Sequence, residues 1–305
     1  MFKKLMGLIA GAVLVAGATV AHAQPTKVAI GFIPVSDWLP AFVAKDKGFF
    51  DKNGLDVTLT KIGIISNIPS ALMSGSLNIG ASTVPVVLDA VEAGLDINAL
   101  AGGTRFVKDP SIFSVVVKTG LPIKSAKDLE GKRVGVPGLR SAGDLLFRKW
   151  LLDKGVQPSK VNIVEAPFPQ MRDLLKAGTL DAVAVLEPFR GRMVEDQTGF
   201  RLSDYVAEVN PDLLGGVWIA RKEWLTANPK VAGAFRNSLK EAIEYIAKNP
   251  ADAKAIETKY TGFNTAFLPP YVLPVSRGDF EFFTKAAREV GYLKNNIDVT
   301  KIIAP

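Results

Sequence analysis

The sequence predicts an α/β protein built from two similar lobes. Strands and helices alternate at the spacing of βαβ units, which place parallel strands in one sheet. Two stretches of the chain, 27–86 and 132–189, also follow the same order of strands, helices and glycines. A repeat of this kind indicates two lobes with one sheet each, although unrelated βα units can also resemble each other.

Each stretch contains three short strands, with a helix after the first strand and a shorter helix after the second. Gly75 and Gly178 end the shorter helices, and glycine is common just beyond a helix C-terminus. Pro85 and Pro188 stand at matching places after the third strand. The expected strands are 28–31, 56–59 and 78–81 in the first stretch and 133–136, 161–164 and 181–186 in the second.

Two further strand-like segments, 114–118 and 216–221, flank the second stretch and are expected to cross between the lobes. The chain would then leave the first lobe and later return to it. We therefore expect lobe 1 to comprise 24–113 and 215–305, and lobe 2 to comprise 114–214. The returning chain is expected to be helical over 223–260, with a stop near Pro250, and over 280–290, with a stop at Gly291.

Residues 1–23 have the three parts of a secretory signal peptide. Two lysines give a positive start, 5–20 contain no charged residue, and the small residues Ala21 and Ala23 provide an exit for cleavage. The apolar run is shorter than the roughly 20 residues of a membrane span, and it is rich in glycine and alanine. We therefore expect cleavage before Gln24 and a soluble protein in the periplasm.

The composition excludes several classes of active site. The sequence has no cysteine, and its single histidine, His22, lies within the expected signal peptide. Disulfide frameworks, Ser-His-Asp and Cys-His sites and His-bearing zinc sites are therefore excluded. The net charge of +7 falls to +5 without Lys3 and Lys4. This charge permits a mild attraction for anions. The sequence contains no block of basic residues of the kind that binds nucleic acid. We expect no catalytic residue, no metal and no cofactor.

Four segments carry a family resemblance. They are Ala44-KDKGFF-Asp51, Ala71-LMSGSLNIG-Ala81, Ser125-AKDLEGKRVGVP-Gly138 and Asp181-AVAVLEP-Phe189. Together they resemble periplasmic solute-binding proteins of ABC importers, in the nitrate/sulfonate/taurine and thiamine-pyrimidine-precursor group. The resemblance implies the type II periplasmic binding fold, in which crossing strands join two Rossmann-like lobes. It also implies a small-molecule solute in the cleft and an ABC permease in the inner membrane as partner, and we expect a monomer.

The candidate ligand contacts follow from a rule for open α/β sheets. Ligands lie beyond the carboxyl ends of the strands, where helix N-termini offer free N–H groups and a partial positive charge. Applied strand by strand, this rule selects residues of both lobes, together with Trp218 of the returning chain. The candidates are Ser36, Asp37, Trp38, Ser66, Asn67, Ser82, Thr83, Arg140, Ser141, Glu187 and Trp218.

Several candidates also have a purely structural interpretation. Ser66 and Ser141 precede helices and can act as N-caps. Trp38 can stack on a flat ligand or pack beside the hinge, and Trp218 can belong to the core. Contact with a ligand is therefore a hypothesis for each of these residues.

Arg140 is the main candidate for holding an anion, because a guanidinium and helix N–H groups can grip a carboxylate or sulfonate together. It can also pair with Asp144, four residues further on, or with Glu187 across the pocket. Arg105 and Arg190 are weaker candidates for the same role. Glu187 could instead accept hydrogen bonds from an amine or a pyrimidine, so the charge of the solute stays open.

We expect a transport receptor for a small organic anion of the sulfonate or carboxylate type. A nitrogenous or aromatic solute, such as a thiamine pyrimidine precursor, is the alternative. The resemblance extends to thiamine-pyrimidine synthases, which bind pyridoxal phosphate and consume an active-site histidine, so the lack of histidine argues against an enzyme. A module that senses a solute for a membrane receptor is a third hypothesis, because it would use the same closing lobes.

Overall fold

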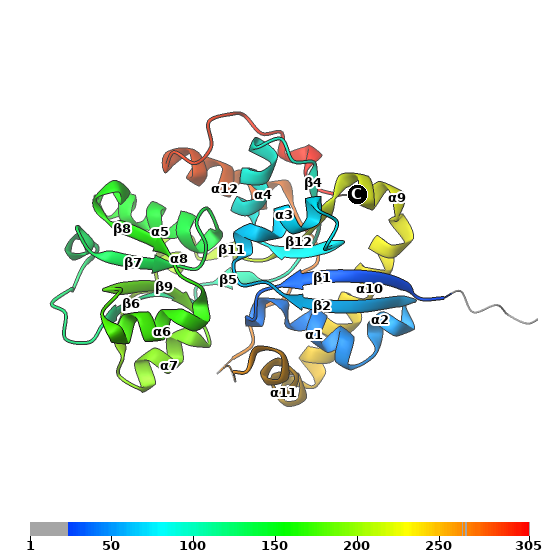
Figure 1. Cartoon of the computed structure of the whole chain (residues 1–305), viewed down its shortest axis with the longest axis horizontal. Coiled ribbons are helices and arrows are strands. Elements are labelled where there is room, and N and C mark those ends of the chain that lie inside the picture. The colour runs from blue at the N-terminus through cyan, green and yellow to red at the C-terminus, as the bar shows by residue number, and fades with distance from the viewer. Residues whose placement is uncertain (1–23, 264, 266, 305) are drawn as a thin grey trace, which may run out of the picture.

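The computed structural model describes residues 24–263, 265 and 267–304, so the expected signal peptide lies outside the described residues. The described chain forms two α/β lobes side by side, lobe 1 and lobe 2, with a five-stranded sheet in each (Figure 1). The sheet of lobe 1 contains β1 (Thr26–Phe32), β2 (Leu55–Lys61), β3 (Ile79–Ser82), β4 (Ile97–Gly102) and β12 (Val217–Arg221). The sheet of lobe 2 contains β6 (Phe113–Lys118), β7 (Arg133–Val136), β8 (Asn162–Glu165), β9 (Ala182–Leu186) and β10 (Gly199–Ser203).

The two sheets have equivalent strand orders. The sheet of lobe 1 runs β2-β1-β3-β12-β4, and the sheet of lobe 2, read from β8, runs β8-β7-β9-β6-β10. In each sheet the first three strands are parallel, and the fourth strand is antiparallel to the third. This equivalence confirms the two similar lobes that the repeated stretches of sequence predict.

The chain passes between the lobes next to a two-stranded ribbon. Its strands, β5 (Arg105–Val107) and β11 (Asp212–Leu214), pair in antiparallel fashion between the two sheets (Figure 1). The segments 114–118 and 216–221, expected to cross between the lobes, instead lie within the sheets as β6 and β12. Each is the strand with which the chain enters a sheet after crossing. The lobe bounds given by the sequence stay a prediction.

Helices occupy the connections where the sequence predicts them. Lobe 1 contains α1 (Leu39–Asp46), α2 (Phe49–Lys52), α3 (Ile68–Met73) and α4 (Val84–Glu92), and lobe 2 contains α5 (Ala142–Asp153), α6 (Phe168–Ala177), α7 (Phe189–Glu195) and α8 (Tyr205–Val209). The returning chain forms α9 (Lys222–Ala227), α10 (Pro229–Lys248), α11 (Pro250–Thr261) and α12 (Arg277–Glu289). Short 3₁₀ helices are η1 (Ser36–Trp38), η2 (Ile65–Asn67), η3 (Ala126–Leu129), η4 (Pro158–Lys160) and η5 (Val299–Lys301).

Local signals explain several of these helix ends. Gly178 caps α6 with a φ of 74°, and Gly75 follows α3 with a φ of 77°. Glycine adopts this left-handed backbone without the steric cost that a Cβ brings. At α12, the side chains of Ser276 and Asp279 form a capping box that satisfies the first backbone N–H groups.

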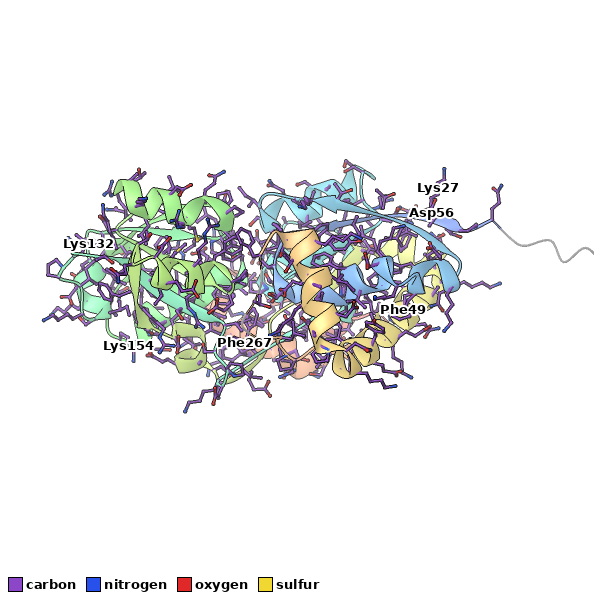
Figure 2. All side chains as sticks on the ribbon, turned by 90° about the horizontal axis from the view of Figure 1, so that it is seen from below. Lys27, Phe49, Asp56, Lys132, Lys154 and Phe267 are labelled. Atoms are coloured by element: carbon purple, nitrogen blue, oxygen red, sulfur yellow. The ribbon has the colours of Figure 1, made fainter. Side chains whose placement is uncertain are left out.

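A second view shows the two lobes side by side. Figure 2 shows Lys27, Phe49 and Asp56 on lobe 1, and Lys132 and Lys154 on lobe 2. Within the described ranges, no helix is both long and apolar enough to span a bilayer.

The core of lobe 1 contains two tryptophans that pack against each other. Trp38 and Trp218 are buried and pack edge to face, with ring centroids 4.9 Å apart. Gly216 lies directly against this pair, because a Cβ at this position would come within 2.8 Å of the Trp38 ring. The close approach therefore requires glycine at 216.

We expect Gly216→Ala to lower the free energy of unfolding by about 1–3 kcal/mol, because the added methyl group overpacks a buried site. Urea denaturation measures this change. Gly233→Ala in α10 is the matched control, since a Cβ there meets nothing within 4 Å, and it should be neutral or stabilising. Equal stability of Gly216→Ala and the wild type would contradict the close packing against Trp38.

Candidate ligand-binding cleft between the lobes

A small cavity lies where the two sheets face each other. Its lining is mostly apolar, with a few polar side chains from each lobe. The space open to water inside it is about 20 Å³, and one water molecule needs roughly 10–15 Å³. The lobes are therefore nearly closed on each other. The lining residues are Ile33, Asp37, Ile65 and Thr83 from lobe 1, Phe106 from the ribbon, and Phe113, Pro137, Ser141, Ala142, Gly143, Phe168 and Leu186 from lobe 2.

Two helix N-termini meet at this cavity. Thr83 is the N-cap residue of α4 in lobe 1, and Ser141 is the N-cap residue of α5 in lobe 2. The backbone N–H of Ala142 donates to Thr83 Oγ1 over 3.2 Å, so the two helix starts contact each other across the cleft. Ser141 makes no capping hydrogen bond, and its buried hydroxyl has no hydrogen-bond partner among the described residues. Its N-cap position therefore leaves the hydroxyl free to bind a ligand.

Asp37 is the acidic group of the cavity. It is 4% exposed, and no partner among the described residues hydrogen-bonds its Oδ1 atom. Burial raises the pKa of Asp37 to about 7, and the nearby carboxylate of Glu257 also raises it. The Thr104 hydroxyl is near enough to lower this pKa, although it stays outside hydrogen-bond geometry. The carboxyl group therefore titrates near neutral pH.

Ser36 and Ser82 are buried beside these cavity residues. Ser36 begins η1, and its carbonyl accepts a 3.0 Å hydrogen bond from the Tyr271 hydroxyl. Ser82 ends β3, and its hydroxyl has no hydrogen-bond partner among the described residues. Both lie next to a residue that lines the cavity, Asp37 and Thr83 respectively.

Three further candidates are absent from the cavity lining, namely Trp38, Trp218 and Asn67. The two tryptophans pack against each other below the cavity and are absent from its lining, as the core interpretation expects. Asn67 is exposed at the end of η2. Ser66, in the same 3₁₀ helix, donates a 2.7 Å hydrogen bond to the Leu139 carbonyl of lobe 2. It therefore connects the lobes and does not cap a helix.

Arg140 joins the lobes outside the cavity. Its Nε pairs with Asp89 of α4, and its Nη2 donates a 2.6 Å hydrogen bond to the carbonyl of Tyr292. The guanidinium also stacks on the Tyr292 ring, 4.5 Å from the centroid. The side chain is absent from the cavity lining, and the backbone N–H, not the guanidinium, donates to Asp144.

The other charged candidates are also paired. Glu187 accepts a 2.7 Å hydrogen bond from Arg190, so the pair considered for Glu187 and Arg140 does not form. Arg105 pairs with Asp212 and Asp279. No arginine proposed for an anion thus lies free in the cavity, and Asp37 is the only charged side chain among the described residues that line it.

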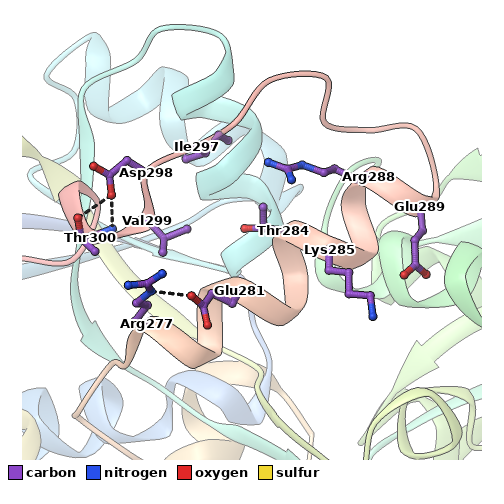
Figure 3. Close-up of a pocket in the computed structure, with 10 residues that line it drawn as sticks. All are labelled: Arg277, Glu281, Thr284, Lys285, Arg288, Glu289, Ile297, Asp298, Val299 and Thr300. Atoms are coloured by element: carbon purple, nitrogen blue, oxygen red, sulfur yellow. Dashed lines mark hydrogen bonds and ion pairs between the residues drawn. The ribbon is translucent and has the colours of Figure 1, made fainter.

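Several grooves are also present among the described residues, and two of them are compared with the cavity. One runs along α12 and the segment 297–300, where Arg277 pairs with Glu281 (Figure 3). This groove has more space, but its lining comes from one region of the chain, 277–300. The other lies between Glu187 of lobe 2 and Thr265 of the returning chain. The cavity at Asp37 is the better candidate, because Asp37 and Ser141 bring buried polar atoms without a described partner to it, whereas Glu187 and Thr265 are hydrogen-bonded to Arg190 and Glu257.

Sequence reasoning missed the aromatic wall of the cavity. Phe168 follows β8, the one strand of the repeat at whose end no candidate was chosen, so the same rule could have found it. Phe106 and Phe113 flank the crossing between the lobes, and no local signal marks them. Their position depends on how the two lobes meet.

Most of the chain matches one protein family. The NMT1/THI5 like family matches residues 36–253. The chain belongs to this family. Among solved structures, the NMT1/THI5 like chain resembles the alkanesulfonate-binding protein SsuA from Xanthomonas axonopodis pv. citri, with a TM-score of 0.80, 18% identity, and coverage of 92% of this chain and 99% of that one. It also resembles the periplasmic nitrate-binding protein NrtA from Synechocystis, with a TM-score of 0.78, 19% identity, and coverage of 92% and 86%. These likenesses confirm the predicted periplasmic binding fold.

Curated relatives of this chain that match most of it are considerably longer than the chain itself. The nitrate/nitrite binding protein NrtA from Nostoc is 27% identical over 256 residues, which cover 77% of this chain and 57% of the relative. The nitrate import ATP-binding protein NrtC from Synechocystis is 27% identical over 270 residues, which cover 79% and 38%. The chain spans 35–57% of the length of the first four relatives.

We expect Asp37→Asn to raise the melting temperature by at least about 3 °C at pH 8 and by less at pH 5. The folded pKa of Asp37, about 7, lies above the ordinary value, so the folded state holds the proton more tightly. Stability from this group is full below about pH 4 and is lost as the pH rises through 7. Scanning calorimetry measures the difference.

Asp298→Asn is the control for this pH dependence. Hydrogen bonds from Thr300 lower the pKa of Asp298, so its effect on stability should not change between pH 5 and pH 8. A constant difference for Asp37→Asn across the same range would show that Asp37 does not titrate as described.

Proposed function

We propose that this protein is the solute-binding component of an ABC import system in the periplasm. The observation that carries the proposal is the cavity shared by both lobes, into which Asp37, Thr83 and Ser141 bring buried polar groups. A solute that contacts both lobes stabilises only the closed arrangement, which a permease can then recognise. The protein acts as a monomer and catalyses no reaction, and the expected mature chain contains no histidine for the synthase chemistry.

The first solute class is the small organic anion, a sulfonate or carboxylate. The N-termini of α4 and α5 support it, because their N–H groups and helix dipoles favour negative charge in the cleft. The names of the related proteins, alkanesulfonate-binding and nitrate-binding, point the same way. A nitrogenous solute is the second class, and the buried Asp37 carboxyl favours it.

Contacts outside the cavity hold the lobes together. Ser66 bonds to Leu139, and Arg140 bonds to Asp89, in each case across the cleft. Gly138 belongs to the same contact, since a Cβ there would lie 3.2 Å from Ser66 Oγ. We assign Ser66 and Arg140 to lobe closure and leave solute contact to Asp37, Thr83 and Ser141, with Ser36 and Ser82 beside them.

A sensing role for the same lobes differs only in the partner. A receptor that signals would bind the closed protein without a permease and an ATPase. Genes for a permease and an ATPase beside this gene would favour import over sensing.

We expect a thermal-shift screen of sulfonates, carboxylates, nitrate and pyrimidines to find a solute that raises the melting temperature. A ligand of the folded state at 100 times its Kd adds about 2.7 kcal/mol of stability. Small-angle scattering should show a more compact protein with the same solute. Ser141→Ala tests the site, because it should reduce this rise in melting temperature. Ser70→Ala, at an exposed position of α3, is the control and should leave the rise unchanged. No stabilisation by any member of the panel would argue against this solute range, and binding without compaction against the two-lobe mechanism.

We expect Arg140→Ala to weaken the binding of every solute by a similar factor of about 3–10. The variant loses a partly exposed ion pair and a hydrogen bond across the lobes, and both favour closure. Scattering without solute should show a larger radius of gyration. Arg277→Ala, whose partner Glu281 is on the same helix, is the control. A loss confined to anionic solutes would place Arg140 against the ligand, as the sequence-based hypothesis has it.

A further inference from the structure

The cavity is lined by an acidic side chain, Asp37, that has no basic partner among the described residues. Asp37 lines it at 4% exposure, and its Oδ1 atom has no hydrogen-bond partner among the described residues. Burial of a carboxyl group without a hydrogen-bond partner costs free energy, and a partner that binds there removes part of this cost. The question is which group supplies the missing partner.

The surrounding side chains do not supply it. The groups that act on Asp37 are the hydroxyl of Thr104 and the acidic side chain of Glu257 from α11. Tyr271 is buried beside them and donates its hydroxyl to the Ser36 carbonyl. Glu257 accepts a 2.6 Å hydrogen bond from Thr265, which leaves Asp37 as the acid that faces the cavity.

The three arginines considered for an anion are engaged elsewhere. Arg105 binds Asp212 and Asp279, Arg140 binds Asp89, and Arg190 binds Glu187. Among the described residues, no ion pair involves Asp37. The partner of this carboxyl group is therefore expected to arrive with the solute.

We propose that the solute carries a hydrogen-bond-donating nitrogen, an ammonium or amino group, which binds the carboxyl group of Asp37. The inference rests on the proposed function and narrows its solute class. An anionic group of the same solute would bind at the N-termini of α4 and α5, and the apolar lining would hold the carbon skeleton between the two ends. Asp37 is then the residue that distinguishes an amino-substituted solute from its amine-free counterpart.

Such recognition depends on pH with a definite sign. The pKa of Asp37 is raised to about 7, so the carboxylate gains its charge between pH 6 and pH 8. Affinity for an ammonium solute should rise over this range. Glu257 is the other acidic group that acts on Asp37, and burial raises the pKa of Glu257 as well.

The test uses pairs of probes that differ only in an amino group. The pairs are 2-aminoethanesulfonate with ethanesulfonate, and 4-aminopyrimidine with pyrimidine. Calorimetry on the wild type should give at least about tenfold tighter binding for the amino member of a pair that binds. Asp37→Asn should remove this preference, so that the ratio of the two affinities falls towards one. Asp51→Asn, at an exposed position of α2, is the matched control and should retain the preference.

The wild type alone provides a second measurement that does not depend on the folding of a variant. Its affinity for 2-aminoethanesulfonate should rise at least about threefold from pH 6 to pH 8, while ethanesulfonate shows no rise. Equal binding of both members of a pair would overturn the role of Asp37 and leave the import function standing. Binding of none of the four probes would overturn this inference together with the proposed solute classes.

Discussion

Burial of polar atoms at the meeting point of two sheets is the constraint on which the rest of this structure depends. Asp37 and Ser141 each place an oxygen there without a hydrogen-bond partner among the described residues, and the unpartnered Ser82 hydroxyl is buried next to Thr83. An unsatisfied buried polar group costs about 1–3 kcal/mol, and a folded protein keeps such a cost where another molecule removes it. The position of these atoms follows from the fold, because the carboxyl ends of parallel strands and the N-termini of their helices meet at the same edge.

The repeated topology explains why the two edges face each other. Each sheet has three parallel strands followed by one antiparallel strand, and the antiparallel strands β6 and β12 enter their sheets after the chain has crossed between lobes. In the part of the chain that the structure describes, the short β5–β11 ribbon is the only strand pair outside the two five-stranded sheets. Two bodies with buried cores and a narrow connection are typical of hinge motion.

The sequence predicted the fold well because its signals are local. Gly75 and Gly178 end the equivalent helices, and the strand-and-helix order alone implied two sheets. The cleft was predicted in part. Asp37, Thr83 and Ser141 were found because they follow strand ends, a property of the immediate sequence. Asp89, the partner of Arg140, is 51 residues away in the chain, so no local rule could show that this arginine is occupied.

The same limit applies to the apolar residues. Trp38 and Trp218 looked suitable for a ligand, but each ring is covered by the other, a contact made by residues far apart in the sequence. Phe106 and Phe113 line the cavity because of the way in which the lobes meet. Chemical type and distance from a strand end were therefore informative, whereas exposure to the cavity was set by tertiary packing.

The energetics of closure follow from the weakness of the contacts between lobes. Arg140 and Asp89 are 38% and 41% exposed, and pairs of this kind contribute about 0–1 kcal/mol. Arg140 also has a φ of 64°, a strained backbone for a residue with a Cβ. Moving a two-state equilibrium from 1:99 to 99:1 takes about 5.5 kcal/mol, more than this pair and the Ser66 hydrogen bond provide. The contacts of Tyr292 with Arg140 and Asp144 add to them. On the proposed function, a solute that bonds to Asp37 and Ser141 at once would stabilise the closed arrangement further, because it satisfies buried polar groups of both lobes.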